Sequence, residues 1–422
     1  MKMNNATLSK GLFLDIRTTA EAINILYKHF PPPSLFESIP ILEANNRVLA
    51  QDIYSQIDVP NFNRSSMDGY ALNAKDTFGA SSSMPAYLNI AGDVLMGEAS
   101  SLRLKSGEAA RIPTGGMLPE GANAVVMIEH THEIDSRILE VQKPVGIWEN
   151  TVCIGQDIKK QSLLFRAGRL LRAYEIGALA AIGQTRVDVY QRLNVGIIST
   201  GDEIVPAHAL PDQGQVRDIN SFIIGSKVLE LGAVPNFYGI VQDRVELIHD
   251  AVKACVYQND VVLICGGSSV GARDFVIDAI SSMGEILVHG VAMRPGKPTI
   301  IAKIDNKPVI GLPGHPASTT IVFLVLVQPL LSHLQNTILT PWHLTAITSR
   351  NIPSQPGRED YVRVKCRMQN AECGMQKTEY LAEPIFGPSG LIRPIFEANG
   401  LIKIPIDCEG LDEGEEVKVM LI

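Results

Sequence analysis

Cysteine is scarce in this chain, and its cysteines follow neither a metal-binding nor a disulfide pattern. The 422 residues include six cysteines, with no C-x-x-C pair and no histidine nearby at zinc-binding spacing. A disulfide framework and a zinc site are therefore not predicted. We expect buried, reduced thiols and a protein of the reducing cytoplasm.

Basic residues are too few for a nucleic-acid surface. The 37 Lys and Arg are outnumbered by 45 Asp and Glu, which gives a formal net charge of -8. Binding of a phosphate backbone depends on clustered Lys and Arg, so we expect no nucleic-acid partner. Any anionic ligand has to be bound by a local group of cations.

Long apolar runs are also absent. A helix needs about 20 apolar residues to cross a membrane, whereas the most apolar run, residues 321–327, is followed at once by Gln328 and Pro329. The first residues carry Lys2 and Lys10 without the apolar core of a signal peptide. We therefore predict no membrane association, and a buried helix at 321–327.

The pattern of apolar residues changes twice along the chain. A helix is predicted at residues 19–30, where apolar residues recur at helical spacing before three prolines. Residues 52–190 contain short apolar runs separated by Gly, Pro and Ser, which is typical of a β-rich region. From residue 194, runs typical of buried strands alternate with helical patterns, and after residue 342 the strand pattern returns.

These changes predict a multidomain α/β and β protein. The central domain, residues 191–336, is expected to be a doubly wound αβ domain with a mostly parallel sheet. The N-terminal region, residues 12–190, is expected to be β-rich, with an inserted module at roughly 60–150. The C-terminal domain, residues 342–422, is expected to be a small β-barrel.

Three glycine-containing loops follow apolar runs in the central domain, at residues 199–203, 265–271 and 311–318. Because the carboxyl ends of parallel strands form the ligand crevice of such a sheet, these loops are expected to line one phosphate-accepting cleft. The second loop lacks the Lys-Ser/Thr of a P-loop and the G-x-G-x-x-G spacing, which argues against an ATPase and a nicotinamide dehydrogenase. Its glycines and serines suit an anion, and they suit a tight strand-to-helix turn equally well.

Charged residues lie close to these loops in the sequence. Arg294 and Lys297 stand on a segment stiffened by prolines, which would hold both charges on an anion; a solvated turn is the alternative. Acids that follow strand-like runs, or lie near one, offer the oxygen ligands that Mg²⁺ requires, although single acids of this kind also cap helices. They are Asp202, Glu203, Asp243 and Asp274.

Eight segments, in order along the chain, resemble the motifs of the molybdopterin molybdenumtransferases, a family that includes the E domain of gephyrin. They are residues 65–71, 112–115 with 118–122, 199–203, 266–271 with Asp274, 294–298, 311–314, 357–361 and 398–401. The resemblance implies that adenylylated molybdopterin and molybdate give molybdenum cofactor and AMP, with Mg²⁺ assisting. It also implies an elongated homodimer, in which the cleft lies between the αβ domain of one subunit and the N-terminal or C-terminal parts of the other.

The same resemblance implies roles for individual residues. Those that match positions used for activity are Thr114, Asp157, Glu203, Asp243, Asp274 and Lys297. Among them, Glu203, Asp243 and Asp274 are the expected ligands of Mg²⁺. Together with the loops, the resemblance assigns binding of the pterin nucleotide and the oxyanion to Gly266, Gly267, Ser268, Ser269, Gly271, Arg294, Pro298, Pro313, Gly314, His315, Pro316, Ser318, Arg358 and Ser389. Arg358 is the first candidate for molybdate.

The chain departs from the family pattern in three places. Residues 152–156 replace a stretch where the family tends to carry basic residues and an acid, His315 stands where Asn is common, and Pro388 enlarges the loop near Ser389. Tungstate therefore stays open as an alternative to molybdate. A non-catalytic scaffold with the same fold is a second alternative, but it would not need the acids of the crevice. A different nucleotide-cleaving enzyme would not need the motifs at 65–71 and 112–115. The molybdopterin adenylyltransferase and the apoenzymes that accept the cofactor are the other expected partners.

Overall fold

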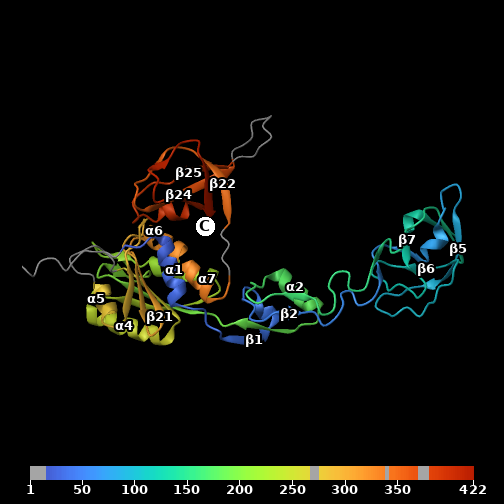
Figure 1. Cartoon of the computed structure of the whole chain (residues 1–422), viewed down its shortest axis with the longest axis horizontal. Coiled ribbons are helices and arrows are strands. Elements are labelled where there is room, and N and C mark those ends of the chain that lie inside the picture. The colour runs from blue at the N-terminus through green and yellow to red at the C-terminus, as the bar shows by residue number, and fades with distance from the viewer. Residues whose placement is uncertain (1–15, 267–274, 338–341, 369–379) are drawn as a thin grey trace, which may run out of the picture. The chain divides into compact units, whose positions relative to one another are not determined.

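The computed structural model describes residues 16–266, 275–337, 342–368 and 380–422. The chain divides into two units (Figure 1). Unit 1 comprises residues 1–37, 46–48 and 190–422, and unit 2 comprises residues 38–45 and 49–189.

Unit 1 opens with helix α1 (Thr19–His29), as predicted. Thr18 caps its first turn, because the Thr18 hydroxyl accepts from the backbone N–H of Glu21 while the Glu21 carboxylate accepts from the backbone N–H of Thr18. Ala22 and Leu26 are buried on one face of the helix. The helix ends at the prolines that follow Phe30, since proline has no backbone N–H to continue it.

A six-stranded sheet forms the centre of unit 1. Its order is β16 (Val234–Val241), β13 (Asn194–Thr200), β17 (Val261–Cys265), β21 (Lys307–Leu312), β20 (Ile300–Ile304) and β18 (Glu285–His289). The first four strands are parallel, and β20 and β18 are antiparallel to their neighbours. All of β17 is buried, which explains its continuous apolar sequence. The predicted αβ domain with a mostly parallel sheet is confirmed.

Helices cover both faces of this sheet (Figure 1). The helices are α3 (Asn220–Glu230), α4 (Val245–Gln258), α5 (Phe275–Ser281), α6 (Pro316–Val322), the π-helical η4 (Phe323–Val327) and α7 (Gln328–Leu334). One apolar core joins the sheet to α1, α3, α6 and α7, and a second joins it to α4 and α5. A sheet covered on both faces leaves the strand ends as the accessible edge for ligands.

The buried helix predicted at 321–327 is part of a longer one. Residues Pro316–Leu334 form 19 continuous helical residues, long and apolar enough to span a membrane, but 72% of the most apolar window is buried inside the protein. The helix therefore belongs to the core of unit 1. Its π-helical segment ends at Val327, two residues before Pro329, which has no backbone N–H to donate to the helix.

A closed barrel follows, also as predicted. Its five strands are β24 (Glu359–Met368), β25 (Tyr380–Pro384), β22 (His343–Thr348), β28 (Glu416–Leu421) and β26 (Gly400–Ile404), and β26 pairs back with β24. The short strand β19 (Met293–Arg294), from the αβ region, runs parallel to the start of β24 and sets Arg294 opposite Asp360. Further short elements of unit 1 are β14 (Ile204–Val205), β15 (Val216–Arg217), β23 (Ile352–Pro353), α8 (Arg393–Phe396) and β27 (Gly410–Leu411).

Unit 2 is β-rich, as predicted. A six-stranded sheet has the order β7 (Ala124–Met127), β4 (Gly69–Leu72), β6 (Glu108–Ile112), β5 (Ala86–Asp93), β9 (Ile138–Val141) and β8 (Thr131–Asp135). The other elements are β1 (Phe36–Pro40), η1 (Ile41–Ala44), β2 (Ile53–Tyr54), β3 (Arg64–Ser65), η2 (Ala74–Thr77), η3 (Ile128–His130), β10 (Thr151–Val152), β11 (Leu163–Phe165), α2 (Ala173–Ala181) and β12 (Arg186–Tyr190). Helix α2 was not predicted from the sequence.

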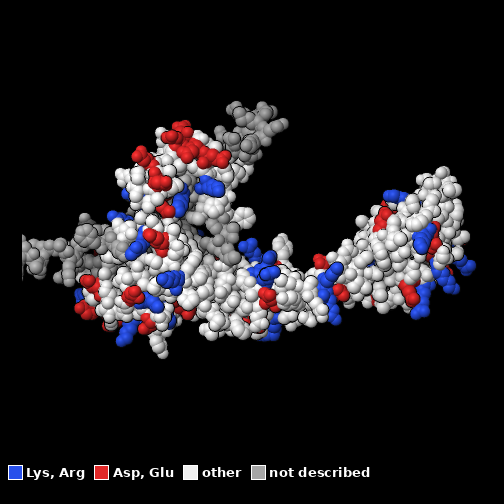
Figure 2. All heavy atoms as spheres, in the orientation of Figure 1, with Lys and Arg blue, Asp and Glu red and all other residues white. Residues whose placement is uncertain are grey.

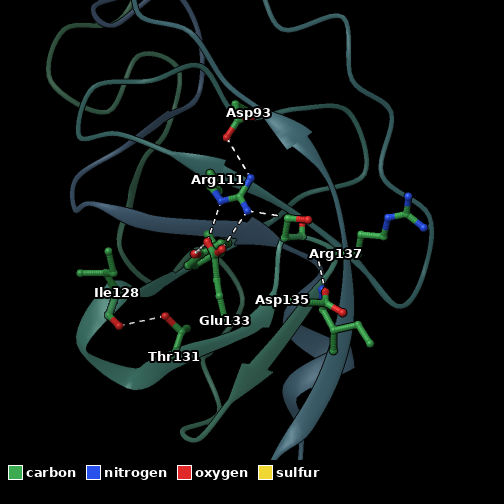
Figure 3. A network of polar contacts seen from close by, with 10 residues as sticks. Asp93, Arg111, Ile128, Thr131, Glu133, Asp135 and Arg137 are labelled. Carbon is green, nitrogen blue, oxygen red and sulfur yellow. Dashed lines mark hydrogen bonds and ion pairs between the residues drawn. The ribbon is translucent and has the colours of Figure 1, made fainter.

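An ion-pair network joins the strands of this six-stranded sheet (Figure 3). Arg111 donates two hydrogen bonds to Glu133, at 2.6 and 2.9 Å, and a third to Asp93 at 3.2 Å. Tyr70 also donates to Glu133. These donors, Arg111 first, lower the pKa of Glu133 to about 2, while burial raises the pKa of Tyr70 to about 12. The network ties β4, β5, β6 and β8 together.

The cysteines only partly match the expectation of buried thiols. Cys255 and Cys265 are buried, and burial raises the pKa of the Cys255 thiol to about 12. Cys153, Cys366 and Cys408 are only partly buried, because they lie in a turn and in the barrel rather than in the central sheet. The five cysteines of the described residues are all free.

Candidate functional site

The carboxyl ends of three parallel strands lie side by side in unit 1, and a glycine loop starts at each. The N–H of Gly201, after β13, donates to the carbonyl of Val241 at 3.3 Å, and the N–H of Gly266, after β17, donates to the carbonyl of Leu312 at 3.2 Å. The structure thus brings the first residues of the three loops to one edge of the sheet. We call this edge the crevice.

Gly266 is required by the closeness of its neighbours. Its φ is +115°, and a Cβ there would collide with the carbonyl of Thr200. A Cβ on Gly314 would lie 3.7 Å from the Cα of Gly266, so the second and third loops also run close together. Four predicted site residues of the second loop, and Asp274 just after it, lie outside the described residues; the four are Gly267, Ser268, Ser269 and Gly271.

Acidic side chains gather where β13 and β16 end. Asp202 and Glu203 are exposed, and the backbone N–H of Asp243 donates to Asp202 Oδ1 at 3.3 Å. Asp243 Oδ1 is buried and has no hydrogen-bond partner among the described residues. Burial raises the pKa of Asp243, and the charges of Asp202 and Glu203 raise it further.

These carboxylates fit a hard divalent cation. A buried carboxylate oxygen without a donor is costly, and oxygen ligands of this kind are the ones that Mg²⁺ prefers. Within the described residues, no three His, Cys, Asp or Glu side chains converge on a metal position. The third predicted ligand, Asp274, lies outside the described residues.

Two polar side chains that the sequence analysis did not select also lie at the crevice. Thr200 Oγ1 and Asn220 Oδ1 are buried and have no hydrogen-bond partner in the part of the chain that the structure describes. Asn220 is the first residue of α3, and its Nδ2 donates to the carbonyl of Gly314 at 2.7 Å. Thr200 lies in the loop at 199–203, which the sequence marks as part of the site. Asn220 lies outside every motif, and only its place at the start of a helix could have indicated it. A helix N-terminus beside glycine loops suits a phosphate.

Cations lie where β19 meets β24. Arg358 Nε donates to Asp360 Oδ1 at 2.9 Å, and Arg294 Nη1 lies 3.9 Å from Asp360 Oδ2. The side chain of Asp360 is 6% exposed, compared with 29% for Arg358 and 63% for Arg294. Lys297 is exposed three residues beyond Arg294, and Pro298 is half-buried. Asp360 therefore contacts both Arg294 and Arg358. The sequence analysis did not identify Asp360 as a site residue.

His315 and Ser389 are direct neighbours. His315 Nδ1 lies 2.8 Å from Ser389 Oγ, and the backbone N–H of Ala317 donates to the Ser389 carbonyl at 3.1 Å. The loop around Ser389 is thus attached to the start of α6. Three other predicted residues, Pro313, Pro316 and Ser318, have buried side chains.

Thr114 and Asp157 belong to unit 2. The backbone N–H and the hydroxyl of Thr114 donate to Asp68 Oδ1, at 2.7 and 2.8 Å, and these two bonds lower the pKa of Asp68. The motifs at 65–71 and 112–115 are therefore joined by one carboxylate. Asp68 lies in the motif at 65–71, which marks the segment in the sequence but does not single out this carboxylate. Asp157 is exposed, and its backbone N–H donates to the carbonyl of Val59 at 3.1 Å.

The fold and the crevice define a multidomain α/β and β protein with carboxylates at the edge of a mostly parallel sheet and cations where the αβ region meets the barrel. Three family models match it in succession: the MoeA N-terminal region (domain I and II) at residues 17–183, a probable molybdopterin binding domain at 196–333, and the MoeA C-terminal region (domain IV) at 345–422. A putative molybdopterin biosynthesis protein of Methanocaldococcus jannaschii is 37% identical over 92% of this chain and 92% of its own length. The chain belongs to the MoeA family of molybdopterin molybdenumtransferases, as its motifs predicted.

Further relatives agree over most of the chain. A molybdopterin molybdenumtransferase of Haemophilus influenzae is 34% identical over 82% of this chain and 85% of its own length. The crystal structure of the molybdopterin biosynthesis MoeA protein from Pyrococcus horikoshii is 36% identical, covers 96% of this chain and 99% of its own, and has a TM-score of 0.80. The fold predicted from the sequence is therefore also the fold of a solved relative.

Proposed function

We propose that this protein is a molybdopterin molybdenumtransferase that inserts molybdate into adenylylated molybdopterin and releases AMP. Family membership supports the reaction, and relatives such as the one from Haemophilus influenzae carry that name. The observation that carries the proposal is the carboxylate cluster of the crevice. Asp243 has a buried oxygen without a partner among the described residues, and the charges of Asp202 and Glu203 disfavour its ionised form. A bound cation would offset this repulsion, so the cluster suits a cation site.

Mg²⁺ is the cation that the proposal requires. Glu203 and Asp243 would hold it, with Asp274 as the third expected ligand. When bound, Mg²⁺ would neutralise charge on the pyrophosphate bridge of the substrate. The raised pKa of Asp243 means that proton and cation compete for the same carboxylate, so metal binding would weaken in acid.

The other residues of the crevice act on the anionic groups of the substrate. The N–H groups of the glycine loops and the N-terminus of α3 would orient the phosphates. Arg294 and Lys297 would offset the charge that builds up as AMP leaves. Molybdate, a dianion, would be held by Arg358 together with the linked pair His315 and Ser389. Thr114 and Asp157 are assigned to activity by the resemblance.

We also propose a cytoplasmic homodimer that meets the molybdopterin adenylyltransferase and the acceptor apoenzymes. Over the face seen in Figure 2, Lys and Arg are scattered and do not form one continuous basic surface, whereas binding of a nucleic-acid backbone depends on clustered cations. A scaffold without catalysis would need no carboxylate with a buried, unpaired oxygen. Transferase activity therefore explains the crevice better.

Tungstate is the second candidate substrate, because His315 stands beside Ser389 where Asn is common in the family. The test compares AMP release with molybdate and with tungstate in the wild type and in His315→Asn. A change in the ratio of the two KM values would assign anion choice to His315, and an unchanged ratio would remove it from anion choice.

The reaction itself is tested by AMP release from adenylylated molybdopterin in the presence of molybdate and Mg²⁺. We expect release by the wild type and at least about a hundredfold loss in Asp243→Asn, since one lost metal ligand weakens metal binding strongly. Equal release by the two proteins would contradict the assigned metal site. No release by the wild type would contradict the function.

A further inference from the structure

A buried carboxylate lies between the two arginines where β19 meets β24. Asp360 lies on β24, directly opposite Arg294 on β19, and follows Arg358 by two positions in the chain. Its Oδ1 accepts a hydrogen bond from Arg358 Nε at 2.9 Å, and its Oδ2 lies 3.9 Å from Arg294 Nη1. With 6% of its side chain exposed, Asp360 is closed off from solvent beneath two more exposed cations.

The bond to Arg358 leaves the ligand-binding end of that side chain available. Only Nε is engaged by Asp360, and the two terminal nitrogens of Arg358 have no partner among the described residues. A guanidinium fixed through Nε presents its terminal N–H groups in a fixed direction, which suits bidentate contact with an oxyanion. Arg294 is too far from Asp360 for a hydrogen bond, so Asp360 does not occupy its donors.

The charges of this group match a dianion. Arg294 and Arg358 carry two positive charges beside the one negative charge of Asp360, and Lys297, three residues beyond Arg294 in the chain, adds a further positive charge to this segment. Without Asp360, the two neighbouring guanidiniums would repel each other before a ligand arrives. The carboxylate therefore allows both to stay in place in the free protein.

Pairing of the two strands does not depend on the Asp360 side chain. The backbone N–H of Glu359 donates to the carbonyl of Ala292 at 2.8 Å, which links the same two segments. The Glu359 side chain itself has other partners: Thr19, Tyr361 and Lys403. The two adjacent acids thus have separate tasks, since Glu359 joins α1 to the barrel and Asp360 contacts the arginines.

We propose that Asp360 is the positioning residue of the oxyanion site, which orients Arg358 and holds Arg294 beside it for a tetrahedral dianion. This inference rests on the proposed function, because it takes molybdate as the anion. Asp360 acts through the two arginines and does not touch the substrate.

The test is Asp360→Asn, which keeps the shape of the side chain and removes its charge. We expect the KM for molybdate to rise about tenfold, while the KM for adenylylated molybdopterin stays close to the wild-type value. The thermal midpoint should fall, because a buried ion pair is lost. Arg358→Lys is a second variant, since lysine keeps the charge but cannot bond Asp360 and still present a planar fork. Arg358→Lys should also raise the KM for molybdate.

Glu359→Gln is the matched control on the same strand. It should lower the thermal midpoint without changing the KM for molybdate. If Asp360→Asn leaves this KM unchanged while Arg358→Ala raises it, the oxyanion site stands and the positioning role is refuted. If Arg358→Ala also leaves it unchanged, the oxyanion site has been misplaced and the inference fails with it. If the wild type releases no AMP with molybdate, the proposed function is contradicted, and the inference that rests on it falls as well.

Discussion

Replacing Asp243 with Asn should make the free protein more stable and the magnesium-bound protein less stable. Asp243 has a buried oxygen without a partner among the described residues, and two further acids oppose its charge. A buried polar group without a partner costs about 1–3 kcal/mol, and more when it is charged. Asn keeps the polar atoms but removes the charge, and because Asp243 is only partly buried, we expect the free energy of unfolding to rise by only about 1 kcal/mol.

The pH dependence of this difference in stability follows from the direction of the pKa shift of Asp243. The pKa of Asp243 is raised above its ordinary value of 3.8, so the folded state holds this proton more firmly than the unfolded state does. Ionisation of Asp243 therefore destabilises the fold, by an amount that is absent below pH 3.8 and complete above the raised pKa. The advantage of the Asn variant should be full at neutral pH and should vanish in acid.

Magnesium should reverse the order of the two proteins. A ligand that binds only the folded state, at a hundred times its Kd, stabilises that state by about 2.7 kcal/mol. The wild type should gain this stabilisation and Asp243→Asn should lose most of it. Thermal unfolding at neutral pH, with and without Mg²⁺, measures both effects, and 1 kcal/mol corresponds to about 1–2 °C for a protein of this size.

The matched control is Glu246→Gln, which removes an exposed acid from the first turn of α4, close to Asp243 in the chain. It should keep the response to Mg²⁺. The reasoning is refuted if Asp243→Asn is less stable than the wild type without metal, or if Mg²⁺ stabilises both proteins equally.

Three other predictions concern separate parts of the chain. Gly266→Ala should lower the free energy of unfolding by about 2 kcal/mol, because a Cβ would meet backbone at a positive φ; an unchanged midpoint in urea would contradict this. The pKa of Glu133 is lowered from 4.5 to about 2, so its ion pair stabilises the fold above pH 4.5 and less as the pH falls towards 2. Arg111→Gln should lower stability at neutral pH and flatten that acid-dependent loss; an equally steep loss would refute this role of the pair. If clefts are shared between subunits, mixing the inactive variants Thr114→Ala and Asp243→Asn should restore about a quarter of wild-type AMP release, whereas no recovery would contradict sharing.

Local pattern was enough to predict the main elements of the central domain. The strand β17 is buried on both faces, and its continuous apolar sequence could only suit such a position or a short helix. Gly266, which follows β17, lies so close to Thr200 at the end of β13 that a side chain would not fit there. Helix α2 was missed because its sequence, AYEIGALAA, carries one charged residue and a glycine, and it lies among short strands.

The contacts that organise the site join residues far apart in the sequence. Asp360 meets Arg294 only because β19 pairs with β24, and His315 meets Ser389 across 74 positions of the chain. Asp68 meets Thr114 across 46 positions. Residue types and motifs indicated that these segments carry chemistry, but strand register and loop docking decide which side chains touch. Those features depend on packing between elements, which no local pattern contains.

The central claim is that this chain transfers molybdenum to a pterin, and the direct measurement is the metal content of the pterin product. Purified protein is incubated with adenylylated molybdopterin, Mg²⁺ and either molybdate or tungstate, and the pterin fraction is analysed for metal by mass spectrometry. The account predicts about one metal atom per pterin, formed together with AMP by the wild type and not by Asp243→Asn. A pterin fraction without metal, after incubation with either oxyanion, would contradict it.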